Sequence, residues 1–236
     1  MRFPLTIMAL CCFYSAGSTS SPIMVVELFT SQGCYSCPPA DALLGKLKKN
    51  PGTITLACHV TYWNYLGWKD TFSRSFCDTR QRRYQAYLQG RAGVYTPQII
   101  INGQYAAVGS RQSSVTRLIE KAKKDSTPAT ITLSASNPGK LTITLPALST
   151  PETQQLFLLG TSGDHRLPIN HGENGGKTLN YYNPVEEVFE LGSWSGQQHT
   201  LHKTINTQSS AIREWVVIAQ QQPLGKIVAA GRLAVQ

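Results

Sequence analysis

The sequence predicts an α/β domain followed by an all-β domain with antiparallel, sandwich-like strands. The first half of the chain alternates short apolar runs with helical repeats, whereas the second half contains short β-like runs separated by turn residues. The 236 residues are 41% hydrophobic, which suits one large domain or two small ones with a real core. We place the first domain at residues 23–126 and the second at 128–236, with a boundary at Asp125 to Pro128.

The first predicted domain has the order β-α-β-α-β-β-α. Its opening run, Ile23 to Thr30, is apolar except for Glu27 and the closing threonine, as is typical of a buried strand. Asp78 is the expected N-cap of the middle helix, and Asn102-Gly103 predicts a two-residue hairpin turn. β-Branched and apolar runs predict the remaining strands at 53–60, 99–101 and 105–108. Apolar residues at helical spacing predict helices at 38–49 and 113–124, and the middle helix is predicted at 78–89.

The second predicted domain contains no convincing helical run. Seven β-like segments follow one another with turn residues between them, at 129–135, 140–145, 155–160, 185–191, 198–204, 215–220 and 227–233. A small antiparallel sandwich is the simplest architecture for this pattern.

Residues 1–20 have the profile of a secretory signal peptide. Arg2 supplies a positive start, an apolar stretch of about a dozen residues follows, and small residues come next. The apolar stretch is shorter than the roughly 20 residues that a membrane-spanning helix needs. Lipid attachment at Cys12 is disfavoured because Cys11 stands where a small residue is expected. The mature protein is therefore predicted to be periplasmic or secreted, without a membrane span.

The formal net charge of +9 comes from 22 Lys and Arg against 13 Asp and Glu. The basic residues are spread along the chain and form no long run. A diffuse positive field is a poor basis for specific nucleic-acid binding, so we predict no nucleic-acid partner.

Four cysteines remain after the leader, namely Cys34, Cys37, Cys58 and Cys77. Four thiols allow three pairings, and the sequence alone does not select one. The close spacing of Cys34 and Cys37 makes that pair the natural first choice, which leaves Cys58 and Cys77 for each other. A bond between the latter two is predicted to be a structural disulfide, worth about 3 kcal/mol of stability in the chain-entropy model.

The strongest motif is Cys34-Tyr35-Ser36-Cys37-Pro38, which lies between a predicted strand and a predicted helix. Cys34 is placed at the helix N-terminus, where unpaired backbone N–H groups favour a thiolate. A lowered thiol pKa would raise the reactivity of Cys34 at neutral pH. Cys37, further into the helix, is predicted to act as the resolving thiol.

Two more residues fit this chemistry. Glu27 lies inside an apolar strand, where an acid is expensive unless it is paired or used, so we predict that it relays the proton of the resolving thiol. Thr96-Pro97 precedes the third strand, and a cis proline there would present backbone beside the sulfurs to an extended substrate. The catalytic set is therefore Cys34, Cys37, Pro97 and Glu27.

Other conspicuous residues are assigned structural roles. Trp63 and Trp68 are interpreted as packing residues, with a substrate groove as the alternative. His59 is interpreted as a hydrogen-bonded core histidine. Glu173-Asn174-Gly175-Gly176 is interpreted as a turn, with a binding loop as the alternative.

The element order, the Cys-x-x-Cys after the first strand and the proline before the third strand resemble the thioredoxin-like superfamily. More narrowly, the chain is similar to the DUF1223 family of secreted bacterial thioredoxin-like proteins. The matching segments are residues 26–34, 37–41, 59–60, 62–63, 66–70, 95–98, 173–175, 191–192 and 194. The resemblance implies a thioredoxin fold with a β-rich C-terminal domain, and it implies no established reaction.

We therefore predict an exported thiol–disulfide oxidoreductase whose clients are protein thiols or disulfides. Neither the direction of electron flow nor the partner that regenerates the enzyme is predicted, and no cofactor or metal is expected. The alternative is a non-catalytic binding module in which the Cys34–Cys37 bond is structural. A weaker possibility is a copper or other metal chaperone that uses the thiols.

Overall fold

The computed structural model describes residues 23–65, 67–88, 94–125, 127–137, 139–150, 152–205 and 211–235. The predicted signal peptide at residues 1–20 lies outside these ranges. Within them, no helix has both the length and the apolar character that crossing a membrane requires.

Three helices and fourteen strands occur in the described part of the chain. The first half contains β1 (Met24–Thr30), α1 (Pro38–Lys48), β2 (Thr53–His59), α2 (Ser75–Tyr87), β3 (Gln98–Ile101), β4 (Tyr105–Val108) and α3 (Gln112–Asp125). The second half contains β5 (Ala129–Thr130), β6 (Thr132–Asn137), β7 (Lys140–Leu145), β8 (Gln154–Thr161), β9 (Asp164–Pro168), β10 (Thr178–Tyr182), β11 (Val185–Trp194), β12 (His199–Thr204), β13 (Glu214–Gln221) and β14 (Ile227–Ala234).

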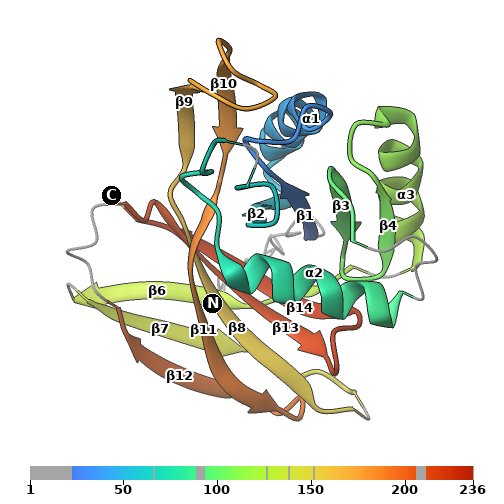
Figure 1. The fold of residues 1–236 in the computed structure, drawn as a ribbon. Helices are drawn as coiled ribbons and strands as arrows, with labels where there is room; N and C mark the ends of the chain where they lie inside the picture. The colour runs from blue at the N-terminus through green and yellow to red at the C-terminus, as the bar shows by residue number, and fades with distance from the viewer. Residues whose placement is uncertain are drawn as a thin grey trace, which may run out of the picture.

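The first four strands form one sheet in the order β2-β1-β3-β4 (Figure 1). β1 runs parallel to β2 and antiparallel to β3. Val26 and Leu28 of β1 point to one face, where they pack against Leu44 of α1 and Val115 of α3. The opposite face of β1 is also buried, which explains why this strand reads as a continuous apolar run rather than an alternating one.

The second half supplies a five-stranded sheet, β11-β8-β13-β14-β5, and a three-stranded sheet, β12-β7-β6. Side chains of β8 alternate between two cores. Leu156 and Leu158 pack with the three-stranded sheet, whereas Phe157 and Leu159 face the first half of the chain. The five-stranded sheet is thus the shared middle layer of the molecule.

The predicted fold class, a thioredoxin-like α/β domain followed by a separate all-β sandwich, is wrong. The protein is mostly β: strands make up 43% and helices 19%, and the strands form several sheets. It shows no clear division into an α/β domain and a β domain. The physical reason is a common core: Val25 and Leu56 of the four-stranded sheet pack directly against Phe157, Val216 and Ile218 of the five-stranded sheet. Each half therefore buries one of its apolar faces only against the other half.

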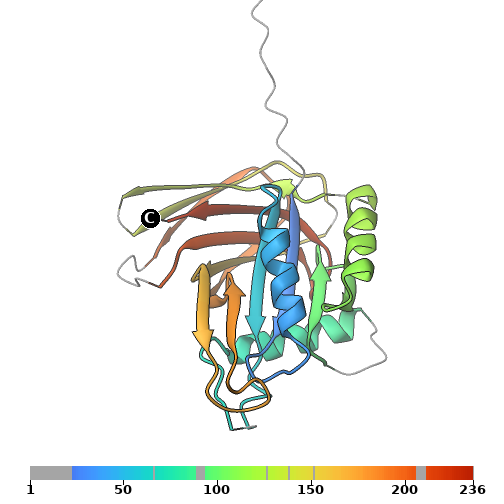
Figure 2. The same cartoon turned by 90° about the horizontal axis from the view of Figure 1, so that it is seen from above.

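Strands β9 and β10 form a two-stranded sheet beside α1 (Figure 2). Tyr182 of β10 packs on α1 at Gly45, where an added Cβ would lie 2.4 Å from the tyrosine ring. Only glycine permits this approach. The polar sequence of these strands carries no alternating pattern, so they were absent from the predicted elements.

The turn and cap predictions have different outcomes. Asn102 and Gly103 both have positive φ, 47° and 70°, which confirms the two-residue turn between β3 and β4. The prediction that Asp78 is a helix N-cap is wrong, because α2 begins earlier, after Arg74. The Asp78 carboxylate instead accepts a hydrogen bond from the backbone N–H of Thr61 at 2.8 Å.

Candidate active site around the Cys34–Cys37 disulfide

Cys34 and Cys37 form a disulfide immediately before α1, with a Cα–Cα distance of 5.4 Å. Cys37 is the N-cap residue of the helix, and its carbonyl accepts the N–H of Asp41 at 3.1 Å. Pro38 begins the helix at a position whose N–H would have no helical partner. Both sulfur-bearing residues have no exposed surface. The predicted first pairing, at the predicted strand-to-helix junction, is confirmed.

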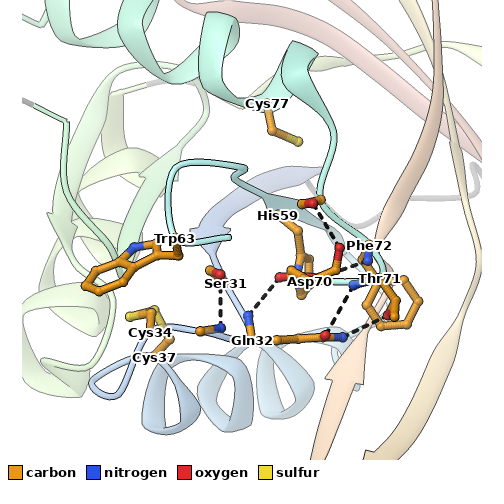
Figure 3. Close-up of polar contacts among 12 residues, drawn as sticks. Ser31, Gln32, Cys34, Cys37, His59, Trp63, Asp70, Thr71, Phe72 and Cys77 are labelled. Atoms are coloured by element: carbon orange, nitrogen blue, oxygen red, sulfur yellow. Dashed lines mark hydrogen bonds and ion pairs between the residues drawn. A yellow bond between two sulfur atoms is a disulfide. The ribbon is translucent and has the colours of Figure 1, made fainter. Parts of the chain in front are cut away.

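Trp63 extends along the disulfide loop toward the predicted cis proline. Its Cβ lies 3.3 Å from the position a Cβ would take on Gly33, and its indole N–H donates to the Thr96 hydroxyl at 2.8 Å. The Thr96–Pro97 peptide bond is cis, as predicted. Figure 3 shows the indole beside Cys34 and Cys37. Trp63 therefore connects the disulfide loop with the proline loop.

The loop between β9 and β10 holds the other side of the disulfide loop. The buried Asn174 side chain donates to the carbonyl oxygens of Gln32 at 3.0 Å and Cys34 at 2.9 Å. Its own side-chain oxygen accepts a hydrogen bond from Lys177 Nζ at 3.0 Å. A residue about 140 positions away thus fixes the backbone of Cys34.

The same loop contacts Tyr35, the exposed residue between the two cysteines. The Tyr35 backbone N–H donates to Glu173 at 3.1 Å, and Lys177 Nζ lies 4.7 Å from the centre of the Tyr35 ring. The Tyr35 side chain is 68% exposed. The segment interpreted as a turn, Glu173-Asn174-Gly175, is therefore a turn that also builds this site.

Asp41 is a buried acid one helical turn beyond Cys37. Residues four apart share a helix face, so Asp41 lies on the same side of α1 as Cys37. The residue is only 4% exposed, and burial raises its pKa from 3.8 to about 7, an effect that nearby His59 partly offsets. This carboxyl group can take up or release a proton near neutral pH.

His59 and Asp70 form a buried pair next to this acid. His59 Nδ1 lies 2.8 Å from Asp70 Oδ2, and the same carboxylate oxygen accepts the Gln32 N–H at 2.7 Å. The His59 ring packs edge-on against Phe72 and Tyr181, with both centroids at 5.3 Å. Figure 3 places Gln32 between the disulfide and the His59–Asp70 pair. The interpretation of His59 as a hydrogen-bonded core histidine is confirmed.

Glu27 lies on the far face of the sheet from α1. Its carboxylate accepts hydrogen bonds from Arg80 Nε at 2.5 Å and from Arg80 Nη2 at 3.0 Å. It also accepts a hydrogen bond from the Tyr84 hydroxyl. Arg80 Nη2 further donates to Gln220 of β13. The structure thus joins Glu27 to α2 and the five-stranded sheet rather than to the two cysteines, and its proton-relay role stays a prediction.

Cys58 and Cys77 form the second disulfide, as predicted, with a Cα–Cα distance of 5.3 Å. The bond connects the end of β2 with the first turn of α2, and it packs among Phe29, Tyr84 and Ile100. It lies in a core cluster separate from that of α1.

Asp41 and Asn174 are site residues whose roles the sequence reasoning missed. Asp41 carried a usable signal, because an acid one turn after Cys37 falls on the buried face of a helix. Asn174 carried none, since its partners are backbone carbonyls supplied by a distant part of the chain.

Among the residues that the structure describes, no group of three or more His, Cys, Asp or Glu side chains is arranged to hold a metal ion. The fold and site define a mostly-β protein that carries a two-cysteine disulfide at a helix N-terminus. The chain belongs to the DUF1223 family of proteins of unknown function, which it matches over residues 25–220.

Solved structures with a similar fold are known. The crystal structure of a protein from Agrobacterium tumefaciens is 27% identical to this chain, with a TM-score of 0.79, and the match covers 91% of this chain and 96% of that one. HBP35 of Porphyromonas gingivalis shares the fold at 14% identity, with a TM-score of 0.66 and coverage of 91% and 75%. No curated protein matches the chain.

Proposed function

We propose that this protein is a thiol–disulfide oxidoreductase that acts on protein thiols or disulfides. The observation that supports the proposal best is the Cys34–Cys37 disulfide at the N-terminus of α1, with the carboxyl group of Asp41 one turn away. A helix N-terminus stabilises the thiolate that reduction produces, and Asp41 has a pKa of about 7 that suits proton transfer.

In the oxidising direction, a client thiolate attacks Cys34 Sγ and the bond between the two cysteine sulfurs breaks. The electron pair of that bond leaves on Cys37, which takes a proton from Asp41. A second client thiolate then attacks the client sulfur of the mixed disulfide, so that a client disulfide forms and Cys34 leaves as a thiolate. The same steps in reverse reduce a client disulfide and oxidise the two cysteines.

An exported location belongs to the same proposal. Its support is the leader-like composition of residues 1–20 together with the two disulfides, which persist in oxidising compartments. Fractionation of cells that express the full chain tests it: we expect a shortened protein outside the cytosol, and a full-length cytosolic protein would contradict it.

The activity is tested with insulin reduction by dithiothreitol and with oxidation of a dithiol peptide. Cys34→Ser should abolish both, and Cys37→Ser should accumulate mixed disulfides between Cys34 and client proteins. The matched control is the double variant Cys58→Ser/Cys77→Ser, which removes the other disulfide and should keep the activity. Full activity of Cys34→Ser would refute the proposal.

The second candidate is a binding module with a static disulfide, and the complete burial of both sulfurs favours it. A redox titration separates the two. A reduction potential of about −120 to −270 mV for the Cys34–Cys37 couple fits turnover, whereas a value below about −300 mV fits a permanent bond.

A further inference from the structure

A cavity of about 340 Å³ lies between α2 and the five-stranded sheet, and its lining includes none of the four cysteines. α2 contributes Phe76, Arg80 and Arg83, and the sheet contributes Phe157, Leu159 and Val188. This volume is in the range of pockets that enclose small organic ligands, roughly 300–1,000 Å³.

The floor of the cavity is apolar. Phe157 and Leu159 project from β8 toward α2, and Val188 projects from the neighbouring edge strand β11. Leu224, from the turn after β13, closes one end. Burying an aliphatic chain against these side chains is favourable, because it removes apolar surface from water.

Arg80 gives the cavity a directional polar group. Its side chain is 6% exposed, and Nε and Nη2 are engaged by Glu27, Tyr84 and Gln220. Nη1 donates to no acceptor among the described residues. Arg80 also lines the cavity. A guanidinium has five N–H donors, so the two on Nη1 remain for an acceptor that enters the cavity.

Arg83 adds a second cation one turn along α2. The cavity continues past this residue into an adjoining hollow of about 300 Å³, which shares Arg83, Phe157, Glu190 and Leu224 and extends to Gln222. Glu190 is the acid that lines the combined space, and this residue is exposed at the rim.

We propose that this cavity binds a small amphipathic carboxylate with a medium-length aliphatic chain. The carboxylate accepts hydrogen bonds from Arg80 Nη1 and Arg83, and the chain lies on Phe157, Leu159 and Val188. Two donor-only arginines select an anion over a cation or an alcohol of the same length, because carboxylates accept charge-assisted hydrogen bonds. The site is independent of the thiol chemistry proposed above.

Calorimetric titration of the full mature chain with decanoate, below its micelle-forming concentration, tests the proposal. We expect one decanoate per chain, with decylamine and decanol binding at least about tenfold more weakly, since each charge-assisted hydrogen bond contributes more than 1.4 kcal/mol. Equal affinity for the three compounds, or no binding of decanoate by the wild-type chain, would overturn the proposal.

Two variants locate the site. Val188→Trp fills the cavity and should abolish decanoate binding, with circular dichroism as the check that the chain folds. Arg83→Gln should weaken binding about tenfold, whereas Arg82→Gln, the neighbouring exposed arginine of α2 that lines neither hollow, should leave it unchanged. Equal effects of the two arginine variants would place the ligand elsewhere and overturn the assignment.

Discussion

His59 Nδ1 lies 2.8 Å from Asp70 Oδ2, and neither side chain has any exposed surface. Burial alone would lower the pKa of His59, but the attraction and hydrogen bond of Asp70 outweigh it and raise the pKa above 6.5. Burial alone would raise the pKa of Asp70, but His59 lowers it below 3.8. Both pKa shifts favour the ionised form of the pair, and the backbone of Gln32 connects the pair to the disulfide loop.

Replacing Asp70 with Asn should destabilise the protein by about 3–5 kcal/mol, because it leaves His59 buried without a counter-charge. Because the pKa of Asp70 is lowered, the pair stabilises the folded state above about pH 4, and this stabilisation is lost as the pH falls further. Because the pKa of His59 is raised, the same stabilisation is complete below about pH 6.5 and is lost as the pH rises through the pKa of His59 in the folded protein. Urea unfolding should show the largest difference from wild type between these limits, and an equal stability throughout would contradict the ionised pair.

Asp41→Asn should raise the stability of the protein at neutral pH, whereas Asp70→Asn should lower it. The carboxyl pKa rises from 3.8 in the unfolded chain to about 7 in the folded one, so the folded state keeps a proton that the unfolded state releases. Wild-type stability therefore falls between about pH 4 and pH 7, by up to about 1.4 kcal/mol per pH unit. Asparagine has no such proton, so the variant should gain stability relative to wild type as the pH rises over this range.

The same variant should slow thiol exchange by at least about tenfold, since Cys37 loses its proton donor. Asp125→Asn, at the end of α3, is the control for a removed acid. A stability difference that stays constant from pH 5 to pH 8 would show that Asp41 does not titrate in this window.

The local structure of the first half was predictable because short-range rules decide it. Cys34 and Cys37 stand between an apolar run and a helical repeat, and Asn102-Gly103 accommodates the positive φ of a tight turn. The overall fold was not predictable, because apolarity does not specify a partner. The run from Ile23 to Thr30 predicts a buried strand, but nothing in it shows that one face of this strand meets the five-stranded sheet.

The candidate site was also predictable only where features close together in the sequence determine it. The cis peptide bond before Pro97 was predictable from its place before the third strand, whereas the role of Pro97 in substrate alignment stays a prediction. Glu27 was predicted to serve the cysteines because it is an acid in an apolar strand, yet the partner that explains its burial is Arg80, 53 positions away. Side-chain period alone could not show which face of the sheet α1 covers.

Removing the Cys58–Cys77 disulfide should lower stability by about 3 kcal/mol in the chain-entropy model. The bond closes a loop of sequence separation 19 and lies in a core cluster apart from α1. Thermal unfolding of Cys58→Ser/Cys77→Ser measures the effect. The reduction potential of the Cys34–Cys37 couple should stay the same, and a large shift in it would mean that the two disulfides are coupled.

Trp63→Ala should accelerate reduction of the Cys34–Cys37 bond by dithiothreitol, because the sulfurs are buried and Trp63 packs against the disulfide loop at Gly33. Trp63→Phe keeps a ring but loses the N–H donated to Thr96, so its effect should be smaller. Tyr65→Ala, at a side chain that is 80% exposed, is the control. If the alanine variants at 63 and 65 react at the same rate, Trp63 does not limit access.

Asn174→Ala should loosen the disulfide loop, because one side-chain amide donates to the carbonyl oxygens of both Gln32 and Cys34. The Gln32 and Cys34 carbonyls then lose this donor, and the Cys34 carbonyl keeps the N–H of Cys37 at 3.2 Å. The loss should cost about 1–3 kcal/mol of stability. We expect faster alkylation of Cys34 after mild reduction and faster amide hydrogen exchange in the disulfide loop. Asn180→Ala, an exposed asparagine on β10, is the matched control and should change neither rate. If Asn174→Ala lowers stability while both rates stay at the wild-type level, Asn174 supports the fold without controlling access to the disulfide.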